Sequence, residues 1–356
     1  MHAGLYLNPQ TPGAADDGRL IEACIEHVRL AERLGYRAVW ITEHAFTGYN
    51  AYSDPLVLGA HLTALAPRLS IGFSVAVGAL HHPIRFATQA ALLDNLTHGR
   101  LICGIGSGVG PDEFNGYGLS AREKYALLDA WTTIVTEAWT HRADDQPFEY
   151  DTPWWRGKID GRIIPAVVQQ PYPPLVRGTL TPAVVRAQAH QGMPFLMSLG
   201  WGNGELLWNT FLDGLDEAEL SSVERTRALE WSAFPQQVFL SDDARDLARG
   251  WEYAKVYISK GVRANLGYDR ASPEQWEQRK DNYRRGLMLA GGSQQVLDKL
   301  APWAERGMRH VMVWAMFGHM PTERAAETIQ RFGEEVLPHL ERIQPAAPAR
   351  APLPVA

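Results

Sequence analysis

Glu43 and His44 are the residues in this sequence best suited to proton transfer. They closely follow an apolar run, Ala38–Ile41, that is typical of a buried strand. An imidazole can accept or donate a proton near neutral pH, so His44 is a candidate catalytic residue, with a purely structural histidine as the alternative. His81 and His82 are adjacent, so their side chains point in different directions, and we expect no metal site.

Thr179 and Thr181 are the residues best suited to binding an anion. Thr181 stands directly before Pro182, which suits a threonine N-cap followed by a proline in the first helical turn. Amide N–H groups at a helix start, two hydroxyls and the nearby Arg177 together form a candidate phosphate site. An ordinary helix cap is the alternative.

Residues 104–110, with the sequence GIGSGVG, form a glycine-rich segment after an apolar run. The segment does not match the dinucleotide-binding fingerprint in any register, and residues 111–119 separate it from the next expected helix. The chain also lacks a Walker-type phosphate loop and a Gly-x-Ser-x-Gly nucleophile motif. The glycines therefore indicate a tight turn, and close approach of a ligand to the backbone is the open alternative.

Short apolar runs alternate with amphipathic segments, which is typical of parallel strands joined by helices. The predicted strands are Gly4–Leu7, Ala38–Ile41, Leu69–Val77, Leu101–Ile105, Leu175–Arg177, Phe195–Ser198, Val238–Leu240 and His310–Met316. The predicted helices are Leu20–Leu34, Asp54–Ala66, Ile84–Thr97, Ala121–His141, Pro182–Gln191, Ala244–Ser259 and Thr322–Leu340. This pattern favours an α/β fold of the (β/α)8 TIM-barrel type, with functional side chains at the C-terminal mouth. An open doubly wound sheet is the alternative.

The composition indicates a folded protein with a large core. Of 356 residues, 46% are hydrophobic and 21% are charged, and the formal net charge is -6. These values exclude wholesale disorder and argue against nucleic acid or an anionic membrane as the main partner. Cys24 and Cys103 are the only cysteines, which excludes a disulfide scaffold and a cysteine-based zinc site. No apolar stretch reaches the roughly 18 residues of a membrane span, and we expect a soluble, cytoplasmic protein.

We expect residues 1–342 to form a single barrel domain with insertions at its C-terminal mouth. Residues 142–174, rich in Pro, Trp and Asp, interrupt the pattern and read as an insertion over the mouth or a loop region. Residues 343–356, with repeated Pro and Ala, are expected to be a disordered tail.

A series of short motifs, in a fixed order, resembles the bacterial luciferase-like flavin-dependent monooxygenases over about residues 1–342. Each motif is modestly specific, whereas their common order and spacing are highly specific. The motifs are GYRAVWITEH (35–44), PLVL (55–58), LHHP (80–83), LLDNLTHGRL (92–101), GIG (104–106), EF (113–114), GYG (116–118), FGHMP (317–321) and EEVLP (334–338).

The resemblance implies a barrel that binds FMN at its mouth. In this family, a separate flavin reductase supplies the reduced flavin, and O2 then forms a C4a-hydroperoxyflavin that oxygenates a small organic substrate. His44 matches the family histidine beside the flavin, and Ser74 and Val75 match a bulge beneath the ring that often contains a cis peptide. Thr179 and Thr181 fall in the phosphate loop of the family. Ser107, Arg177 and Ser198 complete the expected cofactor-binding residues.

Two positions depart from the family pattern. Many members have an arginine that binds phosphate where this chain has Ser107, so hydroxyls, amides and Arg177 would have to hold the phosphate. Ala45 replaces the second histidine of the commonest motif. The sequence Glu43-His44-Ala45 is similar to that of Baeyer–Villiger monooxygenases of the family, and hydroxylation remains open.

Three further expectations concern alternatives and association. A relative that transfers hydride with the deazaflavin F420 is the first alternative, and a non-catalytic flavin-binding protein is the second. Family barrels commonly form homodimers through the two helices Asp54–Ala66 and Ile84–Thr97. The apolar side chains expected to contribute are Leu56, Val57, Ala60, Leu65, Phe86, Ala90, Leu93 and Leu96.

Overall fold

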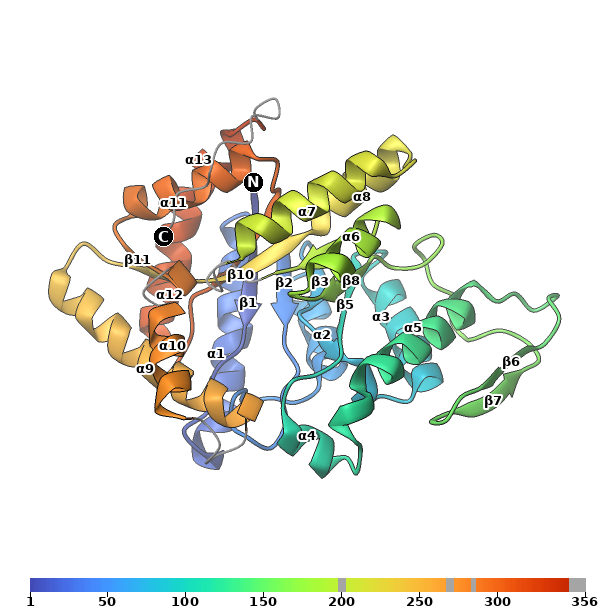
Figure 1. Cartoon of the computed structure of the whole chain (residues 1–356). Helices are drawn as coiled ribbons and strands as arrows, with labels where there is room; N and C mark the ends of the chain where they lie inside the picture. The colour runs from blue at the N-terminus through green and yellow to red at the C-terminus, as the bar shows by residue number, and fades with distance from the viewer. Residues whose placement is uncertain (198–202, 267–271, 283–285, 346–356) are drawn as a thin grey trace.

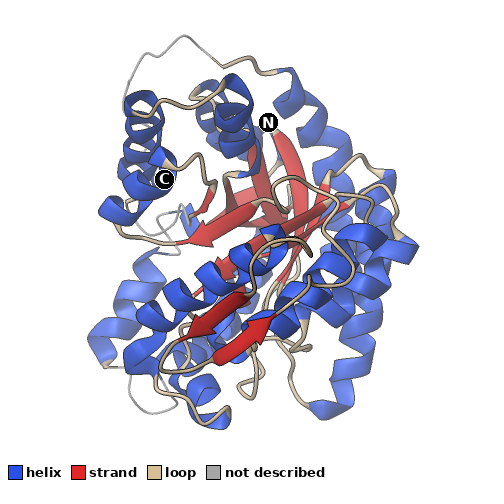
Figure 2. Cartoon of the chain, turned by 90° about the vertical axis from the view of Figure 1, so that its right-hand side faces the viewer, coloured by secondary structure: helices blue, strands red, loops and turns tan. Residues whose placement is uncertain are grey.

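The computed structural model describes residues 1–197, 203–266, 272–282 and 286–345. In these residues eight parallel strand positions form a closed barrel, and helices surround it (Figures 1 and 2). The ring closes because β12 pairs with β1, and β10 pairs with both β9 and β12. The predicted (β/α)8 barrel is therefore confirmed, and the open sheet is excluded. Residues 346–356 of the expected tail lie outside the described residues.

The barrel strands follow one another around the ring in chain order. They are β1 (His2–Leu7), β2 (Ala38–Ile41), β3 (Ser70–Phe73) with β4 (Ala76–Val77), β5 (Leu101–Gly106), β8 (Leu175–Gly178), β9 (Phe195–Leu196), β10 (Ala233–Leu240) and β12 (His310–Trp314). A further strand, β11 (Met288–Gly291), pairs with the second half of β10. The prediction missed β11, because a strand of four residues gives little periodic signal, and it missed the first half of β10, where Pro235 and two glutamines interrupt the apolar run.

Helices cover the outside of the barrel and connect its strands. They are α1 (Ala14–Arg33), α2 (Pro55–Leu65), α3 (Pro83–Leu96), α5 (Lys124–Thr140), α6 (Pro182–His190), α7 (Gly204–Glu217), α8 (Ser222–Trp231), α9 (Ala244–Leu266), α10 (Pro273–Asn282), α11 (Ser293–Glu305), α12 (Thr322–Arg331) and α13 (Leu337–Arg342). Asp54 caps α2 as predicted, since its Oδ1 accepts hydrogen bonds from the amides of Leu56 and Val57. Helices α7, α8, α10 and α11 were not predicted.

Three segments differ from the sequence-based expectation. The predicted strand Leu69–Val77 is divided into β3 and β4, because the chain bulges at Ser74 and Val75. Residues expected to separate the glycine-rich segment from a helix form a helix themselves, α4 (Pro111–Gly116). Residues 142–174 include an antiparallel hairpin, β6 (Phe148–Asp151) and β7 (Arg156–Ile159), which projects from the flank of the barrel beyond α5 (Figure 1).

A buried aromatic cluster closes the barrel at the N-terminal ends of its strands. Trp40 of β2 fits between two glycines of the neighbouring strands. A Cβ atom on Gly72 would lie 2.5 Å from Cε3 of Trp40, and one on Gly4 would lie 2.7 Å from its Nε1. The indole N–H of Trp40 donates a hydrogen bond of 2.9 Å to Nε2 of His310. His310 is buried, and burial is the main reason why its pKa falls to about 3.

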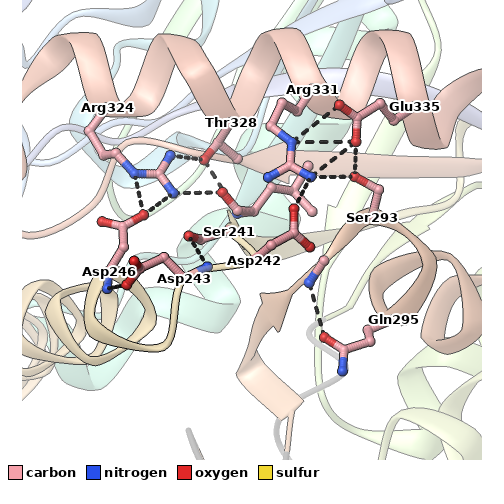
Figure 3. A network of polar contacts seen from close by, with 12 residues as sticks. Ser241, Asp242, Asp243, Asp246, Ser293, Gln295, Arg324, Thr328, Arg331 and Glu335 are labelled. Atoms are coloured by element: carbon pink, nitrogen blue, oxygen red, sulfur yellow. Dashed lines mark hydrogen bonds and ion pairs between the residues drawn. The ribbon is translucent and has the colours of Figure 1, made fainter.

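At the opposite end of the strands, two arginines of α12 hold the loops that follow β10 and β11 (Figure 3). Arg324 donates to the carbonyl oxygen of Leu240 at 2.6 Å and to Oδ2 of Asp246, near the start of α9, at 2.9 Å. Arg331 donates to Oδ2 of Asp242 at 3.0 Å. These contacts fix where α9 begins at the rim of the mouth. In the described part of the chain, no helix combines the length and apolarity needed to cross a membrane.

The buried His310 predicts a loss of stability in acid. Its folded-state pKa of about 3 lies below the ordinary value of 6.5, so the unfolded chain takes up a proton first as the pH falls below 6.5. By pH 4.5 this difference removes about 2–3 kcal/mol from the free energy of unfolding. His310→Gln keeps an acceptor for Trp40 and should flatten this dependence in urea unfolding followed by tryptophan fluorescence. The exposed His61→Gln is the control, and equal pH profiles for all three proteins would contradict the prediction.

Candidate functional site

A cavity of about 470 Å³ lies at the C-terminal ends of the strands. It opens between β2, the β3–β4 bulge, β5, β8 and the start of α6. The predicted site residues that the structure describes all line it: His44, Ser74, Val75, Ser107, Arg177, Thr179 and Thr181. Ser198 lies outside the described residues. The topology explains this convergence, because parallel strands in a closed barrel all end at the same mouth.

Glu113, a buried carboxylate, holds His44 in place. In the sequence, Glu113 stood out only as part of a family motif. Nδ1 of His44 lies 3.1 Å from Oε1 of Glu113 on α4, and the same oxygen accepts a hydrogen bond of 2.9 Å from the amide of Ala45. Glu113 is only 1% exposed, and among the described residues no group donates to its Oε2. Since a carboxylate favours the Nδ1–H form of the imidazole, Nε2 is the nitrogen left for chemistry.

An aromatic series supports the other side of His44. The ring of Tyr49 meets the His44 ring edge-on, with centroids 4.6 Å apart. The hydroxyl of Tyr49 lies 2.5 Å from that of Tyr257 on α9, and Tyr257 in turn packs edge-on against Trp314 of β12. The loop after β2 is thereby braced against α9 and β12, which restricts the orientation of His44.

The glycine-rich strand β5 makes room for the bulge between β3 and β4. A Cβ atom on Gly104 would lie 1.7 Å from the carbonyl oxygen of Phe73, and one on Gly106 would lie 2.5 Å from Cγ2 of Val75. The Ser74–Val75 peptide is cis, as the family resemblance implied. The close approach that these two glycines permit is therefore made by the protein itself, through the backbone of Phe73 and the side chain of Val75.

Two threonine hydroxyls and the guanidinium of Arg177 line the cavity near the start of α6. The hydroxyl of Thr179 accepts a hydrogen bond of 3.2 Å from the amide of Thr181. Thr181 occupies the N-cap position of α6, but its side chain makes no capping hydrogen bond there, in contrast to the simple cap considered above. The guanidinium of Arg177 pairs with Asp129 at 3.0 Å, so part of its charge is already compensated.

Sequence reasoning missed Lys124, the other cation in the cavity lining. Lys124 begins α5, and its Nζ donates to the carbonyl oxygen of Gly108 at 3.1 Å. The signal available in the sequence was a lysine shortly after the glycine-rich segment. Helix α4 turns the chain back toward that segment, so this lysine reaches the cavity. The apolar residues of the cavity lining include Val75, Leu196 and Met197.

The family model for luciferase-like monooxygenases matches residues 1–310, and the chain belongs to this family. The alkanal monooxygenase alpha chain of Photorhabdus luminescens is 23% identical over 201 residues, which cover 56% of this chain and 53% of that relative. The alignment thus spans about half the length of that relative. The F420-dependent glucose-6-phosphate dehydrogenase of Amycolatopsis mediterranei is 23% identical over 337 residues, covering 90% of this chain and 94% of the relative.

Solved structures show the same fold. Monooxygenase RslO1 from Streptomyces bottropensis superposes with a TM-score of 0.82 at 23% identity, covering 95% of this chain and 99% of that one. The oxygenating constituent of 3,6-diketocamphane monooxygenase from Pseudomonas putida, a type II Baeyer–Villiger monooxygenase in complex with FMN, has a TM-score of 0.76 at 16% identity. That match covers 98% of this chain and 100% of the other.

The contact between β5 and the bulge predicts that Gly104 tolerates no side chain. Gly104→Ala places a methyl group against the Phe73 carbonyl and should lower the free energy of unfolding by about 3 kcal/mol or more. Gly161→Ala is the control, because a Cβ atom there has no neighbour within 4 Å. Chemical unfolding of the two variants tests this, and a Gly104→Ala protein as stable as the control would refute it.

Proposed function

We propose that this protein is a two-component, flavin-dependent monooxygenase that receives reduced FMN from a separate flavin reductase. The carrying observation is that one cavity is lined both by the His44–Glu113 pair and by hydroxyls and cations. When bound, reduced FMN would supply the electrons with which O2 is activated to oxygenate a small organic substrate. Membership of the luciferase-like monooxygenase family supports this proposal.

The residues present fit such a cofactor in size and chemistry. A volume of about 470 Å³ lies in the range of cavities that hold drug-sized ligands. Val75, Leu196 and Met197 provide apolar surface for a planar ring. The phosphate would be held by Lys124 together with the threonines before α6, since charge-assisted hydrogen bonds are the strongest ones available to a dianion. Lys124 would then supply a cation that Ser107 does not.

His44 would provide the proton transfers that oxygenation requires. Its Nδ1 is engaged by Glu113, so the opposite nitrogen would donate a proton to, or accept one from, the reacting groups. The sequence Glu43-His44-Ala45, similar to that of Baeyer–Villiger members of the family, and the apolar residues Val75, Leu196 and Met197 of the lining support a ketone as substrate, which would make the reaction a Baeyer–Villiger oxidation. Hydroxylation uses the same residues and would be distinguished by the product.

Hydride transfer with F420 is the second candidate function. The relative from Amycolatopsis mediterranei, named as F420-dependent, aligns with nearly the whole chain and supports this alternative. Titration of the purified protein with FMN and with F420, followed by flavin fluorescence, separates the two candidates. Binding of FMN with no binding of F420 is the expected result, and the reverse would overturn the proposal.

Loss of His44 should uncouple the reaction from oxygenation. We expect His44→Ala to bind reduced FMN normally but to lose product formation by about 10²–10⁴-fold, the usual range for a general acid or base. Hydrogen peroxide should rise as product falls. Glu113→Gln should have the same effect to a smaller degree, because it weakens the hydrogen bond that orients His44. The assay measures product and peroxide with a panel of ketones and aldehydes, and exposed His82→Ala is the control. Unchanged coupling in His44→Ala would assign this residue a structural role.

The phosphate site should distinguish FMN from riboflavin, which has the same ring and no phosphate. A hydrogen bond to a charged group contributes about 1.5–3 kcal/mol, so losing one should weaken FMN about 10–150-fold. We expect this loss in Thr179→Ala, Thr181→Ala and Lys124→Met, with riboflavin affinity nearly unchanged. Lys158→Met, on the hairpin β6–β7, is the control. Equal losses for both ligands would place the phosphate elsewhere.

We further propose that the chain forms a homodimer through α2 and α3. Val57 on α2 is 66% exposed, and Leu92 and Leu96 on α3 are 50% and 47% exposed. These exposed apolar side chains lie on two helices that contact each other, and they favour a partner surface. Several side chains expected to contribute are instead buried in the chain's own core, namely Leu56, Phe86, Ala90 and Leu93.

A charged residue in this surface should separate the subunits. Light scattering at micromolar concentration should give a dimeric mass for the wild-type protein and a monomeric mass for Leu92→Asp. Val223→Asp, at a position 74% exposed on α8, should stay dimeric. A monomeric wild-type protein would rule out the dimer.

A further inference from the structure

Glu43 is a buried carboxylate whose two oxygens both bind the segment that follows the β3–β4 bulge. Its Oε2 accepts a hydrogen bond of 2.6 Å from the amide of Val77, and its Oε1 lies 2.8 Å from Nε2 of His81. Glu43 is 5% exposed and adjoins His44 in the chain, and both residues line the cavity. One side chain therefore connects the loop that carries His44 to the segment that carries the bulge.

Glu43 and His81 form a pair of opposite charges within the site when His81 is protonated. Burial alone would lower the pKa of His81, but the hydrogen bond and the negative charge of Glu43, with a smaller effect of Asp54, raise it. His81 also contacts the Phe86 ring, and its carbonyl accepts a hydrogen bond from Trp131. The phenol of Tyr117 faces Glu43 and Asp54 too, and burial together with those charges raises its pKa, so it stays neutral. Below its raised pKa, His81 is an imidazolium, and its positive charge then compensates Glu43.

An uncompensated carboxylate at this position would disfavour an anion in the cavity. Glu43 lines the same cavity that would hold the phosphate-bearing cofactor, and a buried charge without a partner is strongly unfavourable. Pairing with His81 compensates the charge of Glu43, while Glu43 still accepts the hydrogen bond from the amide of Val77. The neighbouring pair, His44 with Glu113, uses the same combination of groups in a different way, because its histidine faces the cavity and its carboxylate is the positioning group.

We infer that Glu43 and His81 are positioning residues that set the distance between His44 and the bulge at Ser74 and Val75, and that they keep this part of the cavity free of net negative charge. The inference rests on the proposed function, since the bulge and His44 matter together only if a flavin lies between them. It assigns to His81 a role distinct from that of His44: His81 acts on the site through Glu43 and does not touch the reacting atoms.

The first test measures the imidazole of His81 directly by NMR titration of the full-length protein without ligand, with His81→Gln used for assignment. In the wild-type protein the His81 signal should titrate above the ordinary pKa of 6.5. In Glu43→Gln it should titrate below that value, because burial, the largest effect, is then opposed only by the smaller effect of Asp54. The substituted amide can still accept the hydrogen bond from Val77, so the variant should remain folded, which far-UV circular dichroism verifies. A His81 titration that does not respond to Glu43→Gln would overturn the inference.

The second test measures riboflavin affinity between pH 5.5 and 9 by fluorescence quenching. Glu43→Gln and His81→Gln should each weaken riboflavin by about 10–150-fold at pH 7, the effect of losing one charged hydrogen bond. Wild-type affinity should decline as the pH rises through the His81 titration, whereas Glu43→Gln should show no such decline. His27→Gln is the matched control, because His27 is also buried and bonded, to the carbonyl of Thr322, but lies between α1 and α12.

The outcomes separate the inference from the proposed function. If the wild-type protein binds riboflavin and Glu43→Gln binds it equally well at every pH, the positioning role is wrong and the flavin site stands. If the wild-type protein binds neither riboflavin nor FMN, the proposed function fails, and the inference fails with it. Equal weakening by His27→Gln would show a general loss of stability and would also overturn the positioning role.

Discussion

The shape of the site depends on one steric constraint, the contact between the β3–β4 bulge and β5. The carbonyl of Phe73 and the side chain of Val75 occupy the space that side chains at Gly104 and Gly106 would need. Because β5 has no side chains at these two points, the bulge can lie against it and line the cavity. The same strand continues into Ser107 and α4, which carries Glu113 to His44. One local absence of side chains therefore makes room for the bulge, and the same strand leads to the carboxylate that orients the histidine.

The two histidine–carboxylate pairs show how the site manages buried charge. Burying an ionised group is costly unless it is paired, and both Glu43 and Glu113 are almost fully buried. Each is bonded to one histidine and one backbone amide, so each carboxylate fixes a side chain and a loop at the same time. Oε2 of Glu113 differs from the other three oxygens, since no described residue donates to it.

The N-terminal end of the barrel contributes to stability, whereas the C-terminal end carries the candidate site. The N-terminal end is closed by Trp40 and His310, with glycines on the neighbouring strands giving the indole its space. The C-terminal end is held open by loops that are tied down from outside, through the arginines of α12 and the contact of Tyr257 with Tyr49. This division is characteristic of (β/α)8 barrels, in which loops can change while the ring of strands persists.

The sequence by itself determined the class of fold, its approximate elements and the residue types at the mouth. Alternating apolar runs and amphipathic helices required a parallel sheet, and strands such as Ala38–Ile41 were found where the apolar runs predicted them. His44 and Thr179 both follow predicted strands, and the sequence therefore placed them at one mouth, because parallel strands of a barrel end together. The resemblance to the family also implied the bulge at Ser74 and Val75. Short or weakly periodic elements such as β11 and α8 carried too little signal to be found.

Only the tertiary structure decided which side chains are partners. Glu113 lies 69 residues from His44, and His81 lies 38 residues from Glu43, so neither pair has a local pattern that predicts it. Lys124 likewise reaches the cavity only because α4 returns the chain toward Gly108. The glycines of β5 were visible in the sequence, but the groups that approach them, the Phe73 carbonyl and the Val75 side chain, come from another part of the chain. Local periodicity specifies strands and helices, whereas contacts between distant segments depend on how the barrel closes and on the space each side chain leaves.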